Sequence, residues 1–176
     1  MNIDLKSLIR TIPDYPRTGI RFRDISTLLT DAAGFADAIE RMASLAPADI
    51  DLVAGIEARG FLFAGAIAPR IGAGVLMVRK AGKLPGPARG VDYALEYGED
   101  RVEIHDGAVT PGMRVLLVDD LIATGGTALA ATRLIEESGA TCVSASFLVD
   151  LPDLGGATRL RDSGLDVHTL VSFEGE

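Results

Sequence analysis

The chain has 176 residues, of which 48% are hydrophobic and 24% charged, and its 25 acidic and 17 basic residues give a net charge of −8. This composition excludes disorder over the whole chain, the length fits one domain, and the acidic balance is opposite to that of a nonspecific nucleic-acid binder. A single cysteine, Cys142, excludes an intrachain disulfide, and no apolar run approaches the roughly 20 residues of a membrane helix. We therefore expect a cytoplasmic domain with neither nucleic-acid nor membrane partners.

The first half of the chain alternates helical and strand patterns. Phe35, Ile39 and Met42 fall on one helical face, and Asp31 is a suitable N-cap for that helix. Short apolar runs indicate buried strands. In chain order we expect a short helix at 4–10, a helix at 33–45, a strand at 52–56, a helix at 61–70 and a strand at 75–78. The first ~30 residues show little apolar periodicity and are expected to form a flap over the sheet.

The second half continues the alternation after a region rich in turn-forming residues. Residues 79–91 hold three glycines and two prolines, which predicts a mobile loop. Beyond it we expect a hairpin of 93–97 and 101–104, strands at 115–118, 142–149 and 167–171, and helices at 127–138 and 157–161. Because these buried strands lack polar alternation and are separated by helices, they predict an α/β fold with a parallel sheet flanked by helices.

One stretch of this acidic chain is basic. No Asp or Glu occurs from Ala58 to Val91, and two of the three lysines of the whole chain lie there. The basic residues of this stretch are Arg59, Arg70, Arg79, Lys80, Lys83 and Arg89. Such a stretch is equally typical of a small-anion site, whose local potential opposes the net charge, and of a solvated basic face.

Residues 115–127 (VLLVDDLIATGGT) combine a strand, two carboxylates and a turn that opens a helix. The turn, Ala123 to Thr127, has two hydroxyls and two glycines, so its N–H groups can bind a phosphate at the helix N-terminus. Asp119 and Asp120 cannot bind phosphate themselves, but they suit ribose hydroxyls or a Mg²⁺ held through water. The pattern therefore predicts a sugar-phosphate site, although a capped strand–turn–helix without any ligand has the same local sequence.

This segment resembles the ribose-phosphate motif of the type I phosphoribosyltransferases, enzymes that use 5-phosphoribosyl-1-pyrophosphate (PRPP). Four further segments, in similar order and spacing, resemble the adenine phosphoribosyltransferases, one branch of that family. They are 19–26 (GIRFRDIS), 57–63 (EARGFLF), 79–86 (RKAGKLPG) and 95–98 (LEYG). The resemblance runs from about Pro13 to the C-terminus. It implies the type I phosphoribosyltransferase fold as one domain over 1–176, with residues 1–30 contributing a base-binding hood.

The resemblance also implies a reaction: adenine and PRPP give AMP and pyrophosphate, with Mg²⁺, in a homodimeric enzyme of purine salvage. It assigns the ribose 5-phosphate to Asp119, Asp120, Ala123, Thr124, Gly125, Gly126 and Thr127. It assigns pyrophosphate to Arg59, Arg79, Lys80 and Lys83, of which Arg59 and Lys83 are also expected to act in catalysis. The Mg²⁺ is expected to be held through PRPP and water, with Asp119 and Asp120 nearby. The family further implies a cis peptide bond between Glu57 and Ala58.

The purine is assigned by the same resemblance. Glu96 corresponds to a proton-handling group near the purine, whereas its pattern alone favours one face of an exposed hairpin. Arg21, Phe22 and Arg23 correspond to the adenine-contacting segment, and Leu151 to an apolar purine contact. From pattern alone, Phe22 and Leu151 would be core residues. The loop and hairpin from Lys80 to Glu96 are expected to act as a lid that brings Glu96 to the base.

Two alternatives remain at this stage. A phosphoribosyltransferase for an oxopurine such as xanthine or hypoxanthine would share the fold, because base preference rests on a few hydrogen bonds. Segment 19–26 favours adenine, by resemblance. A PRPP-sensing regulator without turnover would be expected to carry a DNA-binding module and a basic surface, and the length and charge of this chain count against it.

Overall fold

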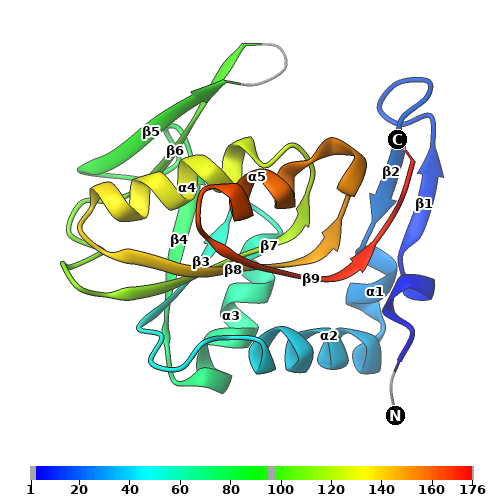
Figure 1. Cartoon of the computed structure of the whole chain (residues 1–176), viewed down its shortest axis with the longest axis horizontal. Helices are drawn as coiled ribbons and strands as arrows, with labels where there is room; N and C mark the ends of the chain where they lie inside the picture. Colours follow the sequence, from blue (N-terminus) through cyan, green and yellow to red (C-terminus); the bar gives the residue numbers. More distant parts are fainter. Residues whose placement is uncertain (1–2, 95–97, 176) are drawn as a thin grey trace.

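The computed structural model describes residues 3–94 and 98–175, in which seven strands form one sheet with helices on both faces (Figure 1). The strand order is β5-β6-β4-β3-β7-β8-β9, with β4, β3, β7, β8 and β9 mutually parallel and β6 antiparallel to both β4 and β5. The strands are β3 (Leu52–Ile56), β4 (Gly74–Lys80), β5 (Ala88–Ala94), β6 (Glu99–His105), β7 (Arg114–Ile122), β8 (Thr141–Asp150) and β9 (Asp166–Ser172). The predicted α/β sheet is confirmed, with an antiparallel hairpin added at one edge.

The helices divide the core into two layers. Helices α2 (Ala32–Ser44) and α3 (Gly60–Ile71) cover one face of the sheet, and α4 (Gly126–Glu137) and α5 (Gly156–Asp162) cover the other (Figure 1). Along β7, Leu116 and Val118 pack into the first layer, whereas Val115 and Leu117 pack into the second. This period of two explains why a strand with no polar alternation is buried on both sides. No helix of the described residues is long and apolar enough to cross a membrane.

Several predicted elements agree closely with the structure. Strand β3 has the predicted bounds, and the Asp31 side chain caps α2 by accepting a hydrogen bond from the Gly34 N–H at 2.8 Å. Helix α3 ends at Gly72, whose φ of 73° lies in the left-handed region that favours glycine. These features depend on residues adjacent in sequence, which explains why their patterns predicted them.

The prediction of a loop over residues 79–91 is wrong at both ends. Strand β4 continues to Lys80 and β5 begins at Ala88, so the segment between the two strands is 81–87. Gly90, which had suggested a turn, is paired with Glu103 inside the hairpin. A Cβ at Gly90 would lie 2.7 Å from Nε of Arg101, so this glycine leaves room for the arginine side chain across the strand.

The N-terminal segment differs from the expected short helix at 4–10. A 3₁₀ helix, η1 (Leu5–Leu8), is followed by β1 (Arg10–Pro13), which pairs antiparallel with β2 (Arg21–Asp24). Helix α1 (Ser26–Thr30) then leads into α2. Arg10 bonds to Asp24 across the hairpin at 2.5 Å, and this pairing across 14 residues favours a strand over the local helical pattern. The hairpin lies beside the C-terminal segment (Figure 1).

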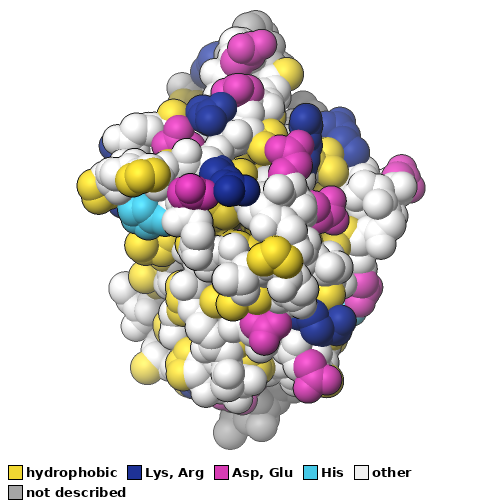
Figure 2. All heavy atoms as spheres, turned by 90° about the vertical axis from the view of Figure 1, so that its left-hand side faces the viewer, with side chains coloured by type: hydrophobic (Ala, Val, Ile, Leu, Met, Phe, Trp, Pro, Cys, Tyr) yellow, Lys and Arg dark blue, Asp and Glu magenta, His cyan; other side chains and the backbone are white. Residues whose placement is uncertain are grey.

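The β5–β6 hairpin carries interleaved charges. Figure 2 views the molecule from the left-hand side of Figure 1 and shows basic and acidic side chains side by side over its upper part. Arg89 pairs with Asp106 at 2.5 Å, and Arg101 pairs with Asp92 at 3.0 Å. Exposed pairs of this kind contribute little to stability, so their main effect is to balance charge on the hairpin.

Candidate active site

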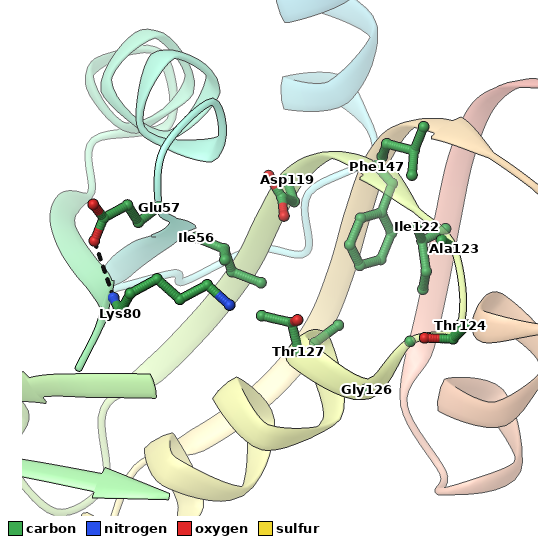
Figure 3. Close-up of a pocket in the computed structure, with 13 residues that line it drawn as sticks. Ile56, Glu57, Lys80, Asp119, Ile122, Ala123, Thr124, Gly126, Thr127 and Phe147 are labelled. Carbon is green, nitrogen blue, oxygen red and sulfur yellow. Dashed lines mark hydrogen bonds between the residues drawn. The ribbon is translucent and has the colours of Figure 1, made fainter. Parts of the chain in front are cut away.

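The turn after β7 forms a cavity of about 180 Å³ at the N-terminus of α4 (Figure 3). Gly125 precedes the helix with a φ of 80°, and no side chain caps it. The first N–H groups of α4 are therefore available to an anion, and the helix dipole favours negative charge there. The cavity is lined by Ile56, Glu57, Lys80, Asp119, Leu121, Ile122, Ala123, Thr124, Gly125, Gly126, Thr127, Ala128 and Phe147. The structure thus brings all five predicted turn residues into one cradle.

Helix α5 supports this cradle from behind. The Gly156 N–H donates to the Ala123 carbonyl at 2.9 Å, and a Cβ at Gly156 would lie 2.3 Å from that carbonyl oxygen. A larger residue at 156 would therefore push the turn out of place. The role of Gly156 was not predicted, because its contact with the cradle joins residues more than 30 positions apart and a Gly-Gly pair alone indicates a turn.

The two carboxylates at the end of β7 have different surroundings. Asp119 lines the cavity, whereas Asp120 is buried and accepts a hydrogen bond from Nε of Arg59 at 2.5 Å. Loss of solvent and the neighbouring Asp120 charge raise the pKa of Asp119 well above its ordinary value. A Cβ at Gly60 would lie 2.9 Å from Oδ1 of Asp119, so this glycine permits the close approach of α3. Both predicted carboxylates therefore lie at the carboxyl edge of the sheet, where ligands bind in such folds.

Glu57 organises the two basic residues at the end of β4. Its carboxylate accepts hydrogen bonds from the Lys80 N–H at 3.0 Å, drawn in Figure 3, and from Nε of Arg79 at 3.2 Å. Burial opposes ionisation, but these bonds and the nearby cations hold the pKa of Glu57 below its ordinary value. The peptide bond between Glu57 and Ala58 is cis, which confirms the expectation. The carboxylate role of Glu57 was missed, because its partners lie 22 and 23 residues away.

The basic stretch without acidic residues is paired through the fold. Lys80 extends into the cavity (Figure 3), and its ammonium bonds to Asp100 at 2.5 Å. The Lys83 side chain is exposed, and its carbonyl accepts a bond from Nη1 of Arg79 at 3.2 Å. The remaining pairs of that stretch are Arg59 with Asp120, Arg70 with Glu40, Arg79 with Glu57 and Arg89 with Asp106. Of the cations of this stretch, Lys80 lines the cavity, and an anion site there stays a prediction.

A second cavity, of about 280 Å³, adjoins the first because Thr124 lines both. Its lining is Ile20, Arg21, Thr124, Leu151, Asp153, Leu154, Phe173 and Gly175. Predicted residues Arg21 and Leu151 thus meet at one cavity, although 130 positions separate them. Phe22 contacts Tyr15, with ring centroids 5.3 Å apart, and Arg23 is buried with its guanidinium 4.4 Å from the Phe173 ring. That Phe173 lines this cavity was not predicted, because no local pattern indicates its contact with residues so far away in the sequence.

Of the two remaining residues, only Tyr93 belongs to the part of the chain that the structure describes. Glu96 lies outside the described residues, between the end of β5 at Ala94 and the start of β6 at Glu99. Tyr93, which the sequence analysis treated only as a strand residue, accepts a hydrogen bond from the Thr127 hydroxyl at 3.0 Å and contacts Lys80. Tyr93 therefore links the hairpin to the phosphate cradle.

A helix N-terminus with free N–H groups, two carboxylates beside it and an adjoining, mainly apolar cavity lie together at the carboxyl edge of the sheet. Residues 26–170 match the family model described as the phosphoribosyl transferase domain, so the chain belongs to the phosphoribosyltransferase family and has its fold.

Three relatives of this chain all belong to one branch of the phosphoribosyltransferases. The chain is 57% identical, over 99% of its length and 96% of the relative, to adenine phosphoribosyltransferase of Sphingopyxis alaskensis. The crystal structure of adenine phosphoribosyltransferase from Thermoanaerobacter pseudethanolicus superposes with a TM-score of 0.91 at 46% identity, covering 97% of this chain and 98% of that one. A Saccharomyces cerevisiae adenine phosphoribosyltransferase complexed with an imino-altritol bisphosphate and adenine gives a TM-score of 0.86 at 36% identity, covering 96% and 97%. The chain belongs to the adenine phosphoribosyltransferase family.

Proposed function

We propose that this protein transfers the 5-phosphoribosyl group of PRPP to adenine, giving AMP and pyrophosphate, as a step of purine salvage. The observation that carries the proposal is the junction of the two cavities at Thr124. One cavity offers helix N–H groups to a phosphate, and the other offers Leu151 and Phe173 to a planar base. The distance between a phosphate and a base in one nucleotide requires such an adjoining pair of subsites.

The cradle is the 5-phosphate subsite in this proposal. N–H groups from Ala123, Thr124, Gly125, Gly126 and Thr127 donate to the phosphate, and the hydroxyls of Thr124 and Thr127 add two further donors. Asp119 and Asp120 accept hydrogen bonds from the two ribose hydroxyls. Such positioning holds the ribosyl carbon in line between the leaving pyrophosphate and the incoming base.

Departure of pyrophosphate from the ribosyl carbon develops charge that the basic residues stabilise. Lys80 reaches the cavity, while Arg59 lies at the N-terminus of α3 and Arg79 lies next to Lys80 at the end of β4. Lys83 belongs to segment 81–87 and reaches the departing group when that segment closes. Fixed cations aimed at a leaving polyanion are among the strongest means of lowering such a barrier.

The base is held between the N-terminal hairpin and the β8 end. Leu151 contacts the purine face, and the segment of Arg21, Phe22 and Arg23 contacts its edge. Glu96 accepts the imidazole proton that adenine loses as its N9 bonds to the ribosyl carbon. A general base of this kind contributes roughly 10²–10⁴-fold to the rate. In this proposal residues 1–30 form the base-binding hood of one domain that spans 1–176.

The residues at the end of β7 fit a magnesium ion bound through the substrate. The Asp119 carboxylate lines the cavity, and carboxylate oxygens are ligands that Mg²⁺ accepts while keeping several waters. Among the described residues no group of three or more His, Cys, Asp or Glu side chains is placed to hold a metal alone. Mg²⁺ bound to the diphosphate would neutralise part of its charge, and Asp119 and Asp120 would orient the hydrated ion.

The exposed apolar side chains of α3 and β4 support a homodimer. Leu62, Val75 and Met77 are 49%, 47% and 45% exposed, and the last two share one face of β4. Large apolar side chains gathered on one surface are typical of an interface with another protein. A second copy of this chain is the occupant that we propose, in a cytoplasmic enzyme.

The proposal is tested by AMP formation from adenine and PRPP in the presence of Mg²⁺, with hypoxanthine, guanine and xanthine as alternative bases. We expect AMP from adenine and little product from the three oxopurines. Faster turnover of an oxopurine would identify the enzyme as one for that base, and tight PRPP binding without product would identify a PRPP-binding regulator.

A further inference from the structure

The ammonium of Lys80 lies between the cavity and the carboxylate of Asp100. Figure 3 shows its side chain extending into the cavity toward Ile56 and Thr127. The same ammonium donates a hydrogen bond to Oδ2 of Asp100 on β6 at 2.5 Å. About a third of each side chain is exposed, 34% for Lys80 and 28% for Asp100, so a ligand in the cavity can reach the pair. The Asp100 carboxylate is therefore already paired with the cation that would bind an anion in the cavity.

Asp100 is held in this position by more than the ion pair. The Tyr93 hydroxyl donates to Oδ2 of Asp100 at 2.8 Å, and the Arg101 N–H donates to Oδ1 at 2.8 Å. The bond from Lys80, followed by those from Arg101 and Tyr93, lowers the pKa of Asp100, so the carboxylate is ionised at neutral pH. Its negative charge is thus always present beside the Lys80 ammonium, which lines the cavity.

The hydrogen inventory connects this pair to the phosphate cradle. An ionised carboxylate only accepts, so the Tyr93 hydroxyl must give its hydrogen to Asp100. The Thr127 hydroxyl, 3.0 Å from the Tyr93 oxygen, must then be the donor in that contact. Thr127, Tyr93, Asp100 and Lys80 therefore form one chain of hydrogen bonds from the cradle to the ion pair. This chain limits how far Asp100 can move away when an anion arrives.

We propose that Asp100 is a positioning residue that acts through Lys80 as a built-in counter-ion and weakens the binding of pyrophosphate. An incoming diphosphate shares Lys80 with Asp100 and is repelled by its charge, so affinity is lower than the cations alone would give. The same repulsion favours release of the pyrophosphate product. This inference rests on the proposed function, because that function places pyrophosphate at Lys80.

The test compares two variants of the full chain, Asp100→Asn and Asp100→Glu, with the wild type by calorimetric titration with pyrophosphate and with PRPP, each with Mg²⁺. Asp100→Asn keeps the acceptor oxygen and removes the charge, and we expect it to bind both ligands roughly three- to tenfold more tightly than the wild type. The gain should shrink as salt rises, because salt screens the lost repulsion. Asp100→Glu keeps the charge and should show no gain. Affinity for adenine should be unchanged in all three proteins.

Asp92→Asn is the matched control. Asp92 lies in the same hairpin, is 67% exposed and pairs with Arg101 at 3.0 Å, so its variant loses the same charge without touching Lys80. We expect wild-type affinities from it. A gain of equal size in Asp92→Asn would overturn the inference in favour of a general charge effect.

Unchanged or weaker pyrophosphate binding by Asp100→Asn, with adenine binding intact, would also overturn the inference while leaving the proposed function standing. Where the Asn variant disturbs the hairpin, Asp100→Ala removes the same charge and should give the same gain in affinity for pyrophosphate. No gain in affinity in Asp100→Ala would also overturn the inference. A wild-type protein that binds neither pyrophosphate nor PRPP would overturn the proposed function itself and this inference with it.

Discussion

Nε of Arg59 donates a hydrogen bond to Oδ2 of Asp120 at 2.5 Å, and this bond joins the N-terminus of α3 to the carboxyl end of β7. The Arg59 side chain is 53% exposed, whereas that of Asp120 is 6% exposed. The buried carboxylate therefore anchors an arginine whose side chain is otherwise half exposed. This arrangement orients a flexible side chain before substrate arrives, which reduces the entropy that binding must overcome.

Replacing Arg59 by alanine should weaken PRPP binding and destabilise the fold together. The variant removes a proposed pyrophosphate donor and leaves Asp120 buried without its cation. We expect kcat/KM for PRPP to fall about tenfold or more and the free energy of unfolding to fall by about 1–2 kcal/mol. Steady-state kinetics and urea unfolding measure the two effects. Arg133→Ala, which removes an exposed arginine paired with Glu137 on α4, is the control; normal turnover in Arg59→Ala would contradict the role.

Asp119→Asn should stabilise the fold but weaken the binding of PRPP. Because the pKa of Asp119 is raised on folding, the folded state holds the proton more tightly, and ionisation costs stability as pH rises from about 4 through the raised pKa. The variant should therefore have a higher Tm than the wild type at pH 7.5, and the difference should vanish at pH values below about 4. Its affinity for PRPP should fall and its affinity for adenine should not. Thermal melts across pH measure this, with the exposed Asp162→Asn as the control. A Tm at pH 7.5 that is equal to or lower than that of the wild type would contradict the prediction.

Two glycine substitutions should separate binding from folding. A Cβ at Gly126 would lie 3.6 Å or more from its neighbours, so Gly126→Val should fold but block the phosphate from the cradle. Gly156→Ala would place its Cβ 2.3 Å from the Ala123 carbonyl and should lower the free energy of unfolding by about 1–3 kcal/mol. Calorimetric titration with AMP and thermal melts distinguish them. Wild-type AMP affinity in Gly126→Val would show that the phosphate binds elsewhere.

Glu96→Gln should lower kcat by roughly 10²–10⁴-fold while leaving PRPP affinity almost unchanged, because the amide keeps the shape of the side chain but cannot accept the purine proton. Single-turnover kinetics with adenine and PRPP measure the chemical step directly. Glu99→Gln in the same hairpin is a control with the same change of charge. Full kcat in Glu96→Gln would assign the proton transfer to another group.

The segment 81–87 should become protected from hydrogen exchange when PRPP binds. It contains glycines and prolines between β4 and β5, and Lys83 there is exposed and gains a polyanionic partner in the complex. Amides of β5 are already paired with β6 and should change less. Exchange measured by mass spectrometry with and without PRPP tests this. Equal protection of 81–87 in both states would exclude closure of this segment.

The sequence by itself determined the features whose residues are neighbours in the chain. The capped helix α2, strand β3 and the strand–turn–helix of 115–127 all follow from patterns over 20 residues or fewer, because backbone propensity and hydrophobic period act locally. The resemblance added the roles of separate segments. It assigned Arg21 and Leu151 to one base, whereas local pattern alone would have placed Leu151 in the core.

Only the tertiary structure decided which distant residues meet. Gly90 looks like a turn residue in sequence, yet it lies in a strand because its backbone pairs with β6, where its missing side chain leaves room for Arg101. The contacts of Tyr93 with Thr127 and of Glu57 with Arg79 likewise join segments more than 20 residues apart. Contacts of this kind depend on strand order and register, which are set by the packing of the whole sheet rather than by local periodicity.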